Sequence, residues 1–188
     1  MGRGRLVNLP NALTVIRILL IPLFLYKALT GDIGFAAVVY IAAAVTDGLD
    51  GFIARFWNLQ TRLGTFLDPL ADKLLIATSY VTLAILGIAP LWLSLAVLSR
   101  DIIIALGSLV KYLMEGDLTI RPRPIGKVTT FFQFLYVLLA LLTTGIWGHG
   151  NETVWAVTLA GPLAYWTGGL TVVSGAVYIL DGFRGMED

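Results

Sequence analysis

Five aspartates lie within stretches of the sequence that are otherwise almost entirely apolar. They are Asp47, Asp50, Asp68, Asp72 and Asp101. A charge that faces lipid at the centre of a helix costs at least ~2.5–3.5 kcal/mol on insertion scales, so intramembrane carboxylates are expected to face a partner or a cavity. These five residues are therefore the first candidates for a functional site.

Four of the aspartates are spaced so that their side chains converge. Asp47 and Asp50 are three positions apart, which puts both on one face of a helix, and Asp68 and Asp72 are four apart on the next helix. The connection between the two helices, Trp57–Leu63, is short and makes them antiparallel neighbours. We expect the four carboxylates to lie together at a similar depth.

Carboxylates held this close repel one another unless cations neutralise them. Arg55 and Lys73 are the nearest basic residues and supply only two charges. The sequence has no cysteine, and its single histidine, His149, is predicted on the opposite side of the membrane. A ligand set made only of oxygen suits Mg²⁺ or Mn²⁺, and two divalent ions per site would balance the charge. The alternative is a buried salt-bridge network among the four aspartates, Arg55 and Lys73.

The composition requires a membrane to hold these residues. The 188 residues are 57% hydrophobic and 13% charged, with a mean hydropathy of +0.85, which is too apolar for a soluble domain. The length allows one domain, residues 1–188, with five or six spanning helices. The apolar stretches are Leu13–Leu29, Gly34–Phe56, Thr65–Gly87, Leu91–Met114, Val128–Trp147 and Val154–Leu180. We predict an all-α integral membrane protein with six transmembrane helices.

Lysine and arginine gather at alternate connections between these stretches. They are Arg3, Arg5, Arg62, Lys111, Arg121, Arg123, Lys127 and Arg184. The positive-inside rule then makes both termini and the Met114–Pro124 loop cytoplasmic, with the polar site in the cytoplasmic half of the bundle. The expected location is a bacterial inner (plasma) membrane, surrounded by membrane lipids. A net charge of +1 gives no indication of a nucleic-acid partner.

Glycines beside the carboxylates remove side chains where a ligand could approach. Gly51 and Gly64 favour clearance for a bulky ligand, whereas Gly48 fits close helix packing equally well.

These residues resemble the signature of the CDP-alcohol phosphatidyltransferase family. Its order here is Asp47-x-x-Asp50-Gly51-x-x-Ala54-Arg55, then Gly64-x-x-x-Asp68-x-x-x-Asp72. Similar segments flank it: the run from Asn8 to Arg17, Leu67–Lys73, Ser99-Arg100-Asp101, and the run from Gly126 to Gln133.

The resemblance implies a six-helix fold with two metal ions, which transfers a phosphatidyl group from CDP-diacylglycerol to an alcohol and releases CMP. It assigns Asp47, Asp50, Asp68 and Asp72 to the metals, and Asp72 also to general-base catalysis. It assigns the cytidine nucleotide to Asp47, Gly51, Ala54, Arg55 and Gly64. A homodimer is left open.

The acceptor is narrowed to a glycerol-type alcohol, either glycerol 3-phosphate or the head group of phosphatidylglycerol. Arg17, Arg100 and Lys127 are candidate acceptor-binding residues for both. Many glycerophosphate-using members have Arg-Glu and a further arginine two turns on, whereas this chain has Arg100-Asp101 and then Ser108. That departure favours the cardiolipin-type acceptor. Glycerol 3-phosphate is the commoner bacterial acceptor for a chain of this length, and we place it slightly ahead.

Two non-enzymatic functions remain as alternatives. A cation transporter could bind its ion with the same aspartates but would not need Gly51, Ala54, Arg55 and Gly64 at these spacings. A scaffold without activity would not need intact aspartates. Arg100 also has a purely structural alternative, an ion pair with an aspartate of the site.

Overall fold

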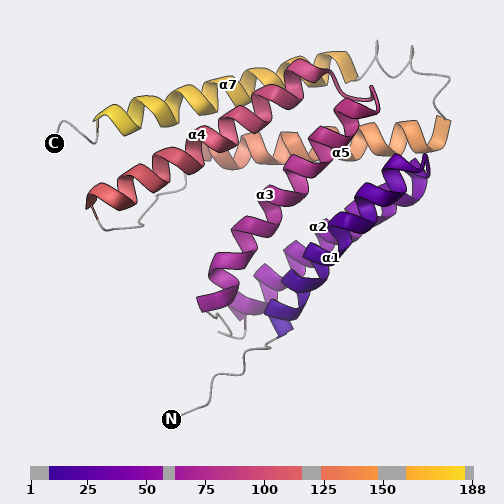
Figure 1. Cartoon of the computed structure of the whole chain (residues 1–188), viewed down its shortest axis with the longest axis horizontal. Coiled ribbons are helices and arrows are strands. Elements are labelled where there is room, and N and C mark those ends of the chain that lie inside the picture. The colour runs from indigo at the N-terminus through magenta and orange to yellow at the C-terminus, as the bar shows by residue number, and fades with distance from the viewer. Residues whose placement is uncertain (1–8, 57–61, 116–123, 148–159, 185–188) are drawn as a thin grey trace. The chain divides into compact units, whose positions relative to one another are not determined.

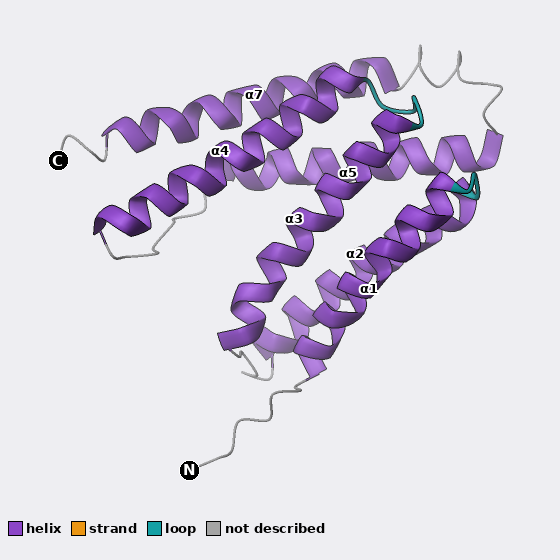
Figure 2. Ribbon diagram, in the orientation of Figure 1, coloured by secondary structure: helices purple, strands orange, loops and turns teal. Residues whose placement is uncertain are grey.

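The computed structural model describes residues 9–56, 62–115, 124–147 and 160–184. Within these residues the chain consists of helices joined by short loops, with no strand (Figure 2). The helices are α1 (Leu9–Leu29), α2 (Ile33–Phe56), α3 (Arg62–Ile85), α4 (Leu91–Glu115), α5 (Pro124–Trp147) and α7 (Gly161–Arg184). The predicted all-α class is confirmed. Contacts divide the chain into two units, residues 1–82 with 141–148 and residues 83–140 with 149–188, each described by itself below.

The first unit is built on a hairpin of α1 and α2 (Figure 1). Gly31 ends α1 with a positive φ of 85°, a conformation that glycine adopts without steric cost. The amides of Gly31 and Asp32 donate to the carbonyls of Ala28 (3.1 Å) and Lys27 (3.0 Å), the two bonds of a Schellman motif. Asp32 then caps α2, because its Oδ1 accepts from the Phe35 amide at 3.3 Å. The chain reverses within three residues and sets α2 against α1.

Small side chains let the helices of this unit approach closely. Ala28 and Ala36 are buried between α1 and α2, together with the tilted pair Phe24 and Tyr40, whose ring centroids are 5.9 Å apart. Gly145, at the end of α5, lies so close to α2 that an added Cβ would be 3.0 Å from the Gly34 Cα. Such contacts between small residues are typical of helices packed in membranes.

The second unit is built on α4 packed against α7. Gly87, with a φ of 71°, repeats the turn that ends α1, since the Ile88 amide donates to the Leu83 carbonyl at 2.8 Å. Trp92 packs on Gly168 so closely that a Cβ there would overlap its ring, and it stacks on Tyr165 at 5.4 Å. Packing at the start of α4 therefore depends on a residue without a side chain.

Polar groups join α5 to α7 inside the second unit. Gln133 Nε2 donates to Thr171 Oγ1 at 3.1 Å, and Thr129 Oγ1 donates to the Leu170 carbonyl at 3.3 Å. Gln133, Thr129 and Thr171 are buried, so these bonds satisfy groups that lipid could not.

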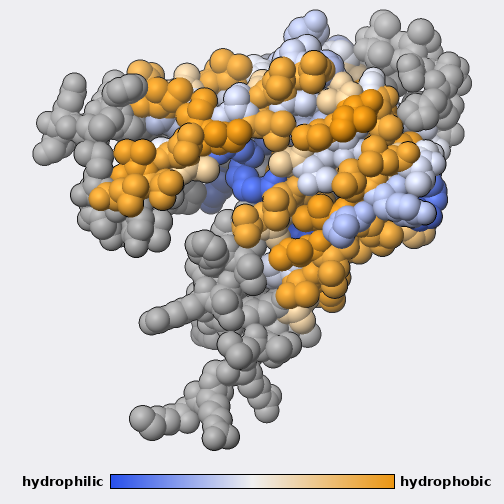
Figure 3. Space-filling view, viewed as in Figure 1, coloured by the Kyte–Doolittle hydropathy of each residue, from blue (hydrophilic) through white to orange (hydrophobic). Residues whose placement is uncertain are grey.

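Four of the described helices contain a stretch with the length and composition of a membrane span. Four stretches are long and apolar enough to cross a bilayer, and they are Ala12–Leu29, Leu91–Val110, Pro124–Gly145 and Gly161–Leu180. Large hydrophobic side chains are exposed along them, and Figure 3 shows such residues over much of the visible described surface. The apolar part of α2, Ile33–Asp47, is shorter. This count is taken over the described residues alone, so the six transmembrane helices stay a prediction.

The helix ends differ from the apolar stretches in a few places. α5 begins at Pro124 rather than Val128, because proline fits the first turn of a helix, and α7 continues to Arg184 beyond Leu180. The residues 57–61, 116–123 and 148–159 lie outside the described part, so His149, the Met114–Pro124 loop and the start of the predicted sixth stretch are not described.

Candidate active site

The four aspartates of the predicted metal site lie on α2 and α3. Asp47 and Asp50 lie in the second half of α2, and Asp68 and Asp72 in the first half of α3. The structure describes the side chains of Asp47 and Asp72, whereas those of Asp50 and Asp68 lie outside the described side chains. The geometry of the site therefore rests on one carboxylate from each helix.

Asp47 and Asp72 meet at a single nitrogen of Arg17. Arg17 Nη1 lies 2.8 Å from Asp47 Oδ1 and 2.5 Å from Asp72 Oδ1. The two carboxylate oxygens can be no farther apart than these two distances together. Arg17, Asp47 and Asp72 thus form one cluster that joins α1, α2 and α3. Arg17 and Asp72 are 55 positions apart in the sequence.

The arginine of this cluster is buried, whereas its two carboxylates are partly exposed. The Arg17 side chain is fully buried, whereas the side chains of Asp47 and Asp72 are 47% and 43% exposed. A buried guanidinium needs negative partners, since an unpaired charge inside a membrane is expensive. The exposed parts of the carboxylates remain accessible to a ligand.

The position of Arg17 between the two carboxylates was not predicted from the sequence. The sequence predicted Arg17 as a candidate for acceptor binding, and Arg55 and Lys73 as the charges nearest to the aspartates. The signal was the arginine itself, which lies in the middle of the apolar stretch that forms α1 and therefore had to find a negative partner. Its role in acceptor binding stays a prediction.

The donor set fits a divalent metal ion in its chemistry. Two carboxylates from different helices already share one cationic nitrogen, and hard oxygen ligands are those that Mg²⁺ and Mn²⁺ prefer. Among the residues whose side chains are described, no group of three or more potential metal ligands gathers. Asp50 and Asp68, which would complete the set, are not among those residues, so the four-aspartate metal site stays a prediction.

The predicted nucleotide-binding residues lie on the helical turns next to these aspartates. Gly51, Ala54 and Arg55 belong to the last two turns of α2, and Gly64 to the first turn of α3. Their side chains and surroundings lie outside the described part, so their contact with a nucleotide stays a prediction.

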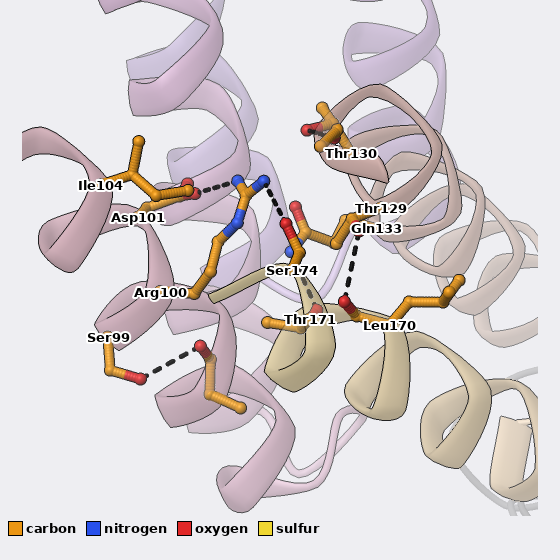
Figure 4. A network of polar contacts seen from close by, with 12 residues as sticks. Ser99, Arg100, Asp101, Ile104, Thr129, Thr130, Gln133, Leu170, Thr171 and Ser174 are labelled. Atoms are coloured by element: carbon orange, nitrogen blue, oxygen red, sulfur yellow. Dashed lines mark hydrogen bonds and ion pairs between the residues drawn. The ribbon is translucent and has the colours of Figure 1, made fainter. Parts of the chain in front are cut away.

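Arg100, a second predicted site residue, forms a polar cluster within the second unit (Figure 4). Its side chain is 5% exposed. Nη1 donates to Asp101 Oδ1 at 2.7 Å, and Nη2 donates to Ser174 Oγ on α7 at 3.0 Å. The Tyr178 ring lies 5.9 Å from the guanidinium carbon. The ion pair found in the described residues is thus with the neighbouring Asp101.

Gly126 on α5 borders this cluster. A Cβ at this position would be 3.0 Å from Tyr178 Oη and 3.3 Å from Arg100 Nη2. Lys127, the next residue and the third candidate for acceptor binding, is exposed. The buried Nε of Arg100 has no hydrogen-bond partner among the described residues. The guanidinium therefore keeps one donor that protein groups in this part of the chain do not satisfy.

Comparison with known proteins identifies the relatives of this chain. The model of the CDP-alcohol phosphatidyltransferase family matches residues 7–177. A protein of Escherichia coli strain K12 named "CDP-diacylglycerol--glycerol-3-phosphate 3-phosphatidyltransferase" is 38% identical over 74% of this chain and 80% of its own length. A Mycobacterium tuberculosis protein named "Probable phosphatidylglycerophosphate synthase" is 32% identical over 97% of this chain and 85% of its own. A Mycobacterium bovis protein named "Putative cardiolipin synthase" is 34% identical over 87% of this chain and 79% of its own.

Proposed function

The chain belongs to the CDP-alcohol phosphatidyltransferase family, and on this premise we propose that it transfers a phosphatidyl group from CDP-diacylglycerol to glycerol 3-phosphate. The products are phosphatidylglycerophosphate and CMP. The observation that carries the proposal is the meeting of Asp47 and Asp72, from two helices, at one buried guanidinium nitrogen. Residues 1–188 act as one catalytic domain.

The reaction exchanges one bond at phosphorus for another. The hydroxyl oxygen of the acceptor forms a bond to the phosphatidyl phosphorus, and the bond from that phosphorus to the CMP oxygen breaks. CMP leaves with the electron pair of that bond. The hydroxyl proton passes to a carboxylate, and we assign this role to Asp72, whose half-exposed side chain can reach a bound substrate.

The residues of α2 and the start of α3 have two further roles in this proposal. Asp47, Asp50, Asp68 and Asp72 would hold two Mg²⁺ or Mn²⁺ ions through carboxylate oxygens. When bound, these ions supply positive charge to the pyrophosphate oxygens and to the departing CMP. Asp47, Gly51, Ala54, Arg55 and Gly64 form the nucleotide site, where the small residues leave room for the cytidine.

The acceptor is recognised by basic residues. The name of the Escherichia coli relative supports glycerol 3-phosphate. This acceptor carries a phosphate dianion, which Arg100 and Lys127 on the second unit, or Arg17 on the first, would attract. The buried Nε atoms of Arg17 and Arg100 both lack a hydrogen-bond partner among the described residues, but Arg17 already pairs with two carboxylates and Arg100 with one, so Arg100 is the stronger candidate.

Phosphatidylglycerol is the second candidate acceptor. Ser108 stands where many glycerophosphate-using members have a further arginine, and its Oγ donates to the Ile104 carbonyl at 2.7 Å within α4. Arg100 is also partly neutralised by Asp101. Both observations reduce the positive charge available to a dianion, and the name of the Mycobacterium bovis relative agrees with cardiolipin synthesis.

An acceptor panel separates these two functions. Purified protein in detergent micelles receives CDP-diacylglycerol, Mg²⁺ or Mn²⁺, and either glycerol 3-phosphate or phosphatidylglycerol. CMP release and the mass of the new lipid are measured. CMP release that depends on glycerol 3-phosphate and yields phosphatidylglycerophosphate supports the proposal. Cardiolipin formed from phosphatidylglycerol, with no response to glycerol 3-phosphate, would replace it with the second function.

We further propose that six helices span a bacterial inner membrane with the site facing the cytoplasm. The alternation of basic connections supports this orientation. Because the chain has no cysteine, single cysteines can be introduced at Leu118 and at His149 and labelled in whole cells with a reagent that does not cross the membrane. Labelling at position 149 alone is expected, and labelling at position 118 alone would reverse the topology.

A further inference from the structure

Arg17 occupies the point at which the metal-binding carboxylates of the proposed function would be neutralised. It comes from α1, whereas its partners Asp47 and Asp72 come from α2 and α3. Nη1 lies within 2.8 Å of an oxygen of each partner, and the arginine is fully buried. A guanidinium in this position supplies a permanent positive charge, because arginine is not deprotonated in proteins.

Two carboxylate oxygens that share one nitrogen would repel each other if that nitrogen were removed. Divalent cations bound by the same carboxylates would relieve the same repulsion. The arginine and the divalent cations therefore perform one electrostatic task, and each is worth less when the other is present. Two groups that substitute for each other have an unfavourable, positive coupling free energy, which a thermodynamic cycle measures.

We propose that Arg17 is a resident counter-cation, a positioning residue that keeps Asp47 and Asp72 together when no metal is bound and that weakens metal binding by its charge. The inference rests on the proposed function, since it assumes that these aspartates bind divalent cations. It separates Arg17 from the acceptor-binding residues and explains why α1 reaches into the site. Its loss is expected to harm the metal-free protein more than the metal-loaded one.

The test compares the full chain with Arg17→Gln in detergent micelles, once with EDTA and once with saturating Mn²⁺. Thermal unfolding is followed by circular dichroism, and Mn²⁺ affinity is measured from the electron paramagnetic resonance signal of the free ion. We expect Arg17→Gln to lower the melting temperature more in EDTA than in Mn²⁺. We expect Mn²⁺ to bind about tenfold more tightly, a modest share of the energy of one nearby charge in a partly exposed site.

Lys27→Gln is the matched control, because it also removes a cation of α1 that is paired with an aspartate, but at the end of the helix ten residues beyond Arg17. It should lower the melting temperature equally in EDTA and in Mn²⁺ and leave Mn²⁺ affinity unchanged. If Arg17→Gln folds only when Mn²⁺ is present, the counter-cation role is supported. If it does not fold in either condition, Arg17→Lys, which keeps the charge but has one cationic nitrogen, is compared in the same way.

Three results would overturn the inference. An equal loss of stability with and without Mn²⁺ would make Arg17 a packing residue. Weaker Mn²⁺ binding in Arg17→Gln would mean that the arginine supports the metal-loaded geometry. A wild-type protein that Mn²⁺ does not stabilise would refute the metal site of the proposed function itself, which the wild-type measurement reveals before any variant is examined.

Discussion

Gly126→Ala tests whether Arg100 serves the acceptor. The new Cβ would lie 3.0 Å from Tyr178 Oη and 3.3 Å from Arg100 Nη2, which is closer than ordinary van der Waals contact allows. Both atoms end flexible side chains, so they can shift by a few tenths of an ångström while the helices keep their places. The guanidinium then loses part of its alignment with Ser174 Oγ, now 3.0 Å from Nη2.

The size of the effect follows from the bonds that are disturbed. A hydrogen bond that involves a charged group contributes about 1.5–3 kcal/mol. Loss of roughly half of one such bond to the acceptor phosphate, about 0.8–1.5 kcal/mol, corresponds to a KM for glycerol 3-phosphate that is roughly four- to twelvefold higher. The KM for CDP-diacylglycerol should change little, because the new Cβ meets Arg100 and Tyr178, and Arg100 is assigned to the acceptor.

Gly175→Ala is the matched control for this variant. Its Cβ would meet the Arg100 stem at 3.6 Å from Cγ, an ordinary contact that leaves the guanidinium in place. Initial rates of CMP release are measured while each substrate is varied in turn. A raised KM for glycerol 3-phosphate in Gly126→Ala alone agrees with acceptor binding by Arg100. Equal rises for both substrates, or equal effects of the two alanines, would refute the reasoning.

Two further predictions concern the fold. Gly168→Ala should lower the free energy of unfolding by about 1–3 kcal/mol in thermal or denaturant unfolding, because its Cβ would overlap the rigid Trp92 ring. Gly169→Ala, whose Cβ would have nothing within 4 Å, should be neutral or slightly stabilising. Equal losses of stability in the two variants would contradict the packing described for α4 and α7. The hydrogen bond from Lys27 lowers the pKa of Asp32 below its ordinary value of 3.8, so its contribution to stability is present above that value and is lost as the pH falls through the lower pKa of the folded state. The melting temperatures of wild type and Asp32→Asn should therefore differ at neutral pH and converge in acid, and a difference that persists unchanged in acid would show that the carboxylate charge is not its cause.

The sequence predicted the helices well, because long apolar runs leave few other structures inside a bilayer. Their ends were less predictable. α5 begins four residues before the apolar run at Val128, since the start of a helix depends on Pro124 and not on hydropathy. The apolar stretch that predicts α7 likewise ends at Leu180, whereas the helix continues to Arg184, because polar residues can extend a helix beyond its apolar part.

The candidate site was predictable where it depends on spacing along one helix, and less so where it depends on contacts between helices. The pairing of Asp47 with Asp72 agrees with the expectation that α2 and α3 bring their carboxylates together. The position of Arg17 between them comes from packing of α1, and no local spacing encodes it. The ion pair of Arg100 with Asp101 was also missed, since adjacent residues do not share a helix face.

The central claim is that the carboxylates brought together on α2 and α3 perform phosphatidyl transfer. It is tested most directly by CMP release from CDP-diacylglycerol, with glycerol 3-phosphate and Mn²⁺, in wild type and in Asp72→Asn. Asparagine keeps the shape of the side chain and removes the base, so turnover should fall by about 10²–10⁴-fold while binding of CDP-diacylglycerol is largely kept. Near-normal CMP release from folded Asp72→Asn would contradict the claim.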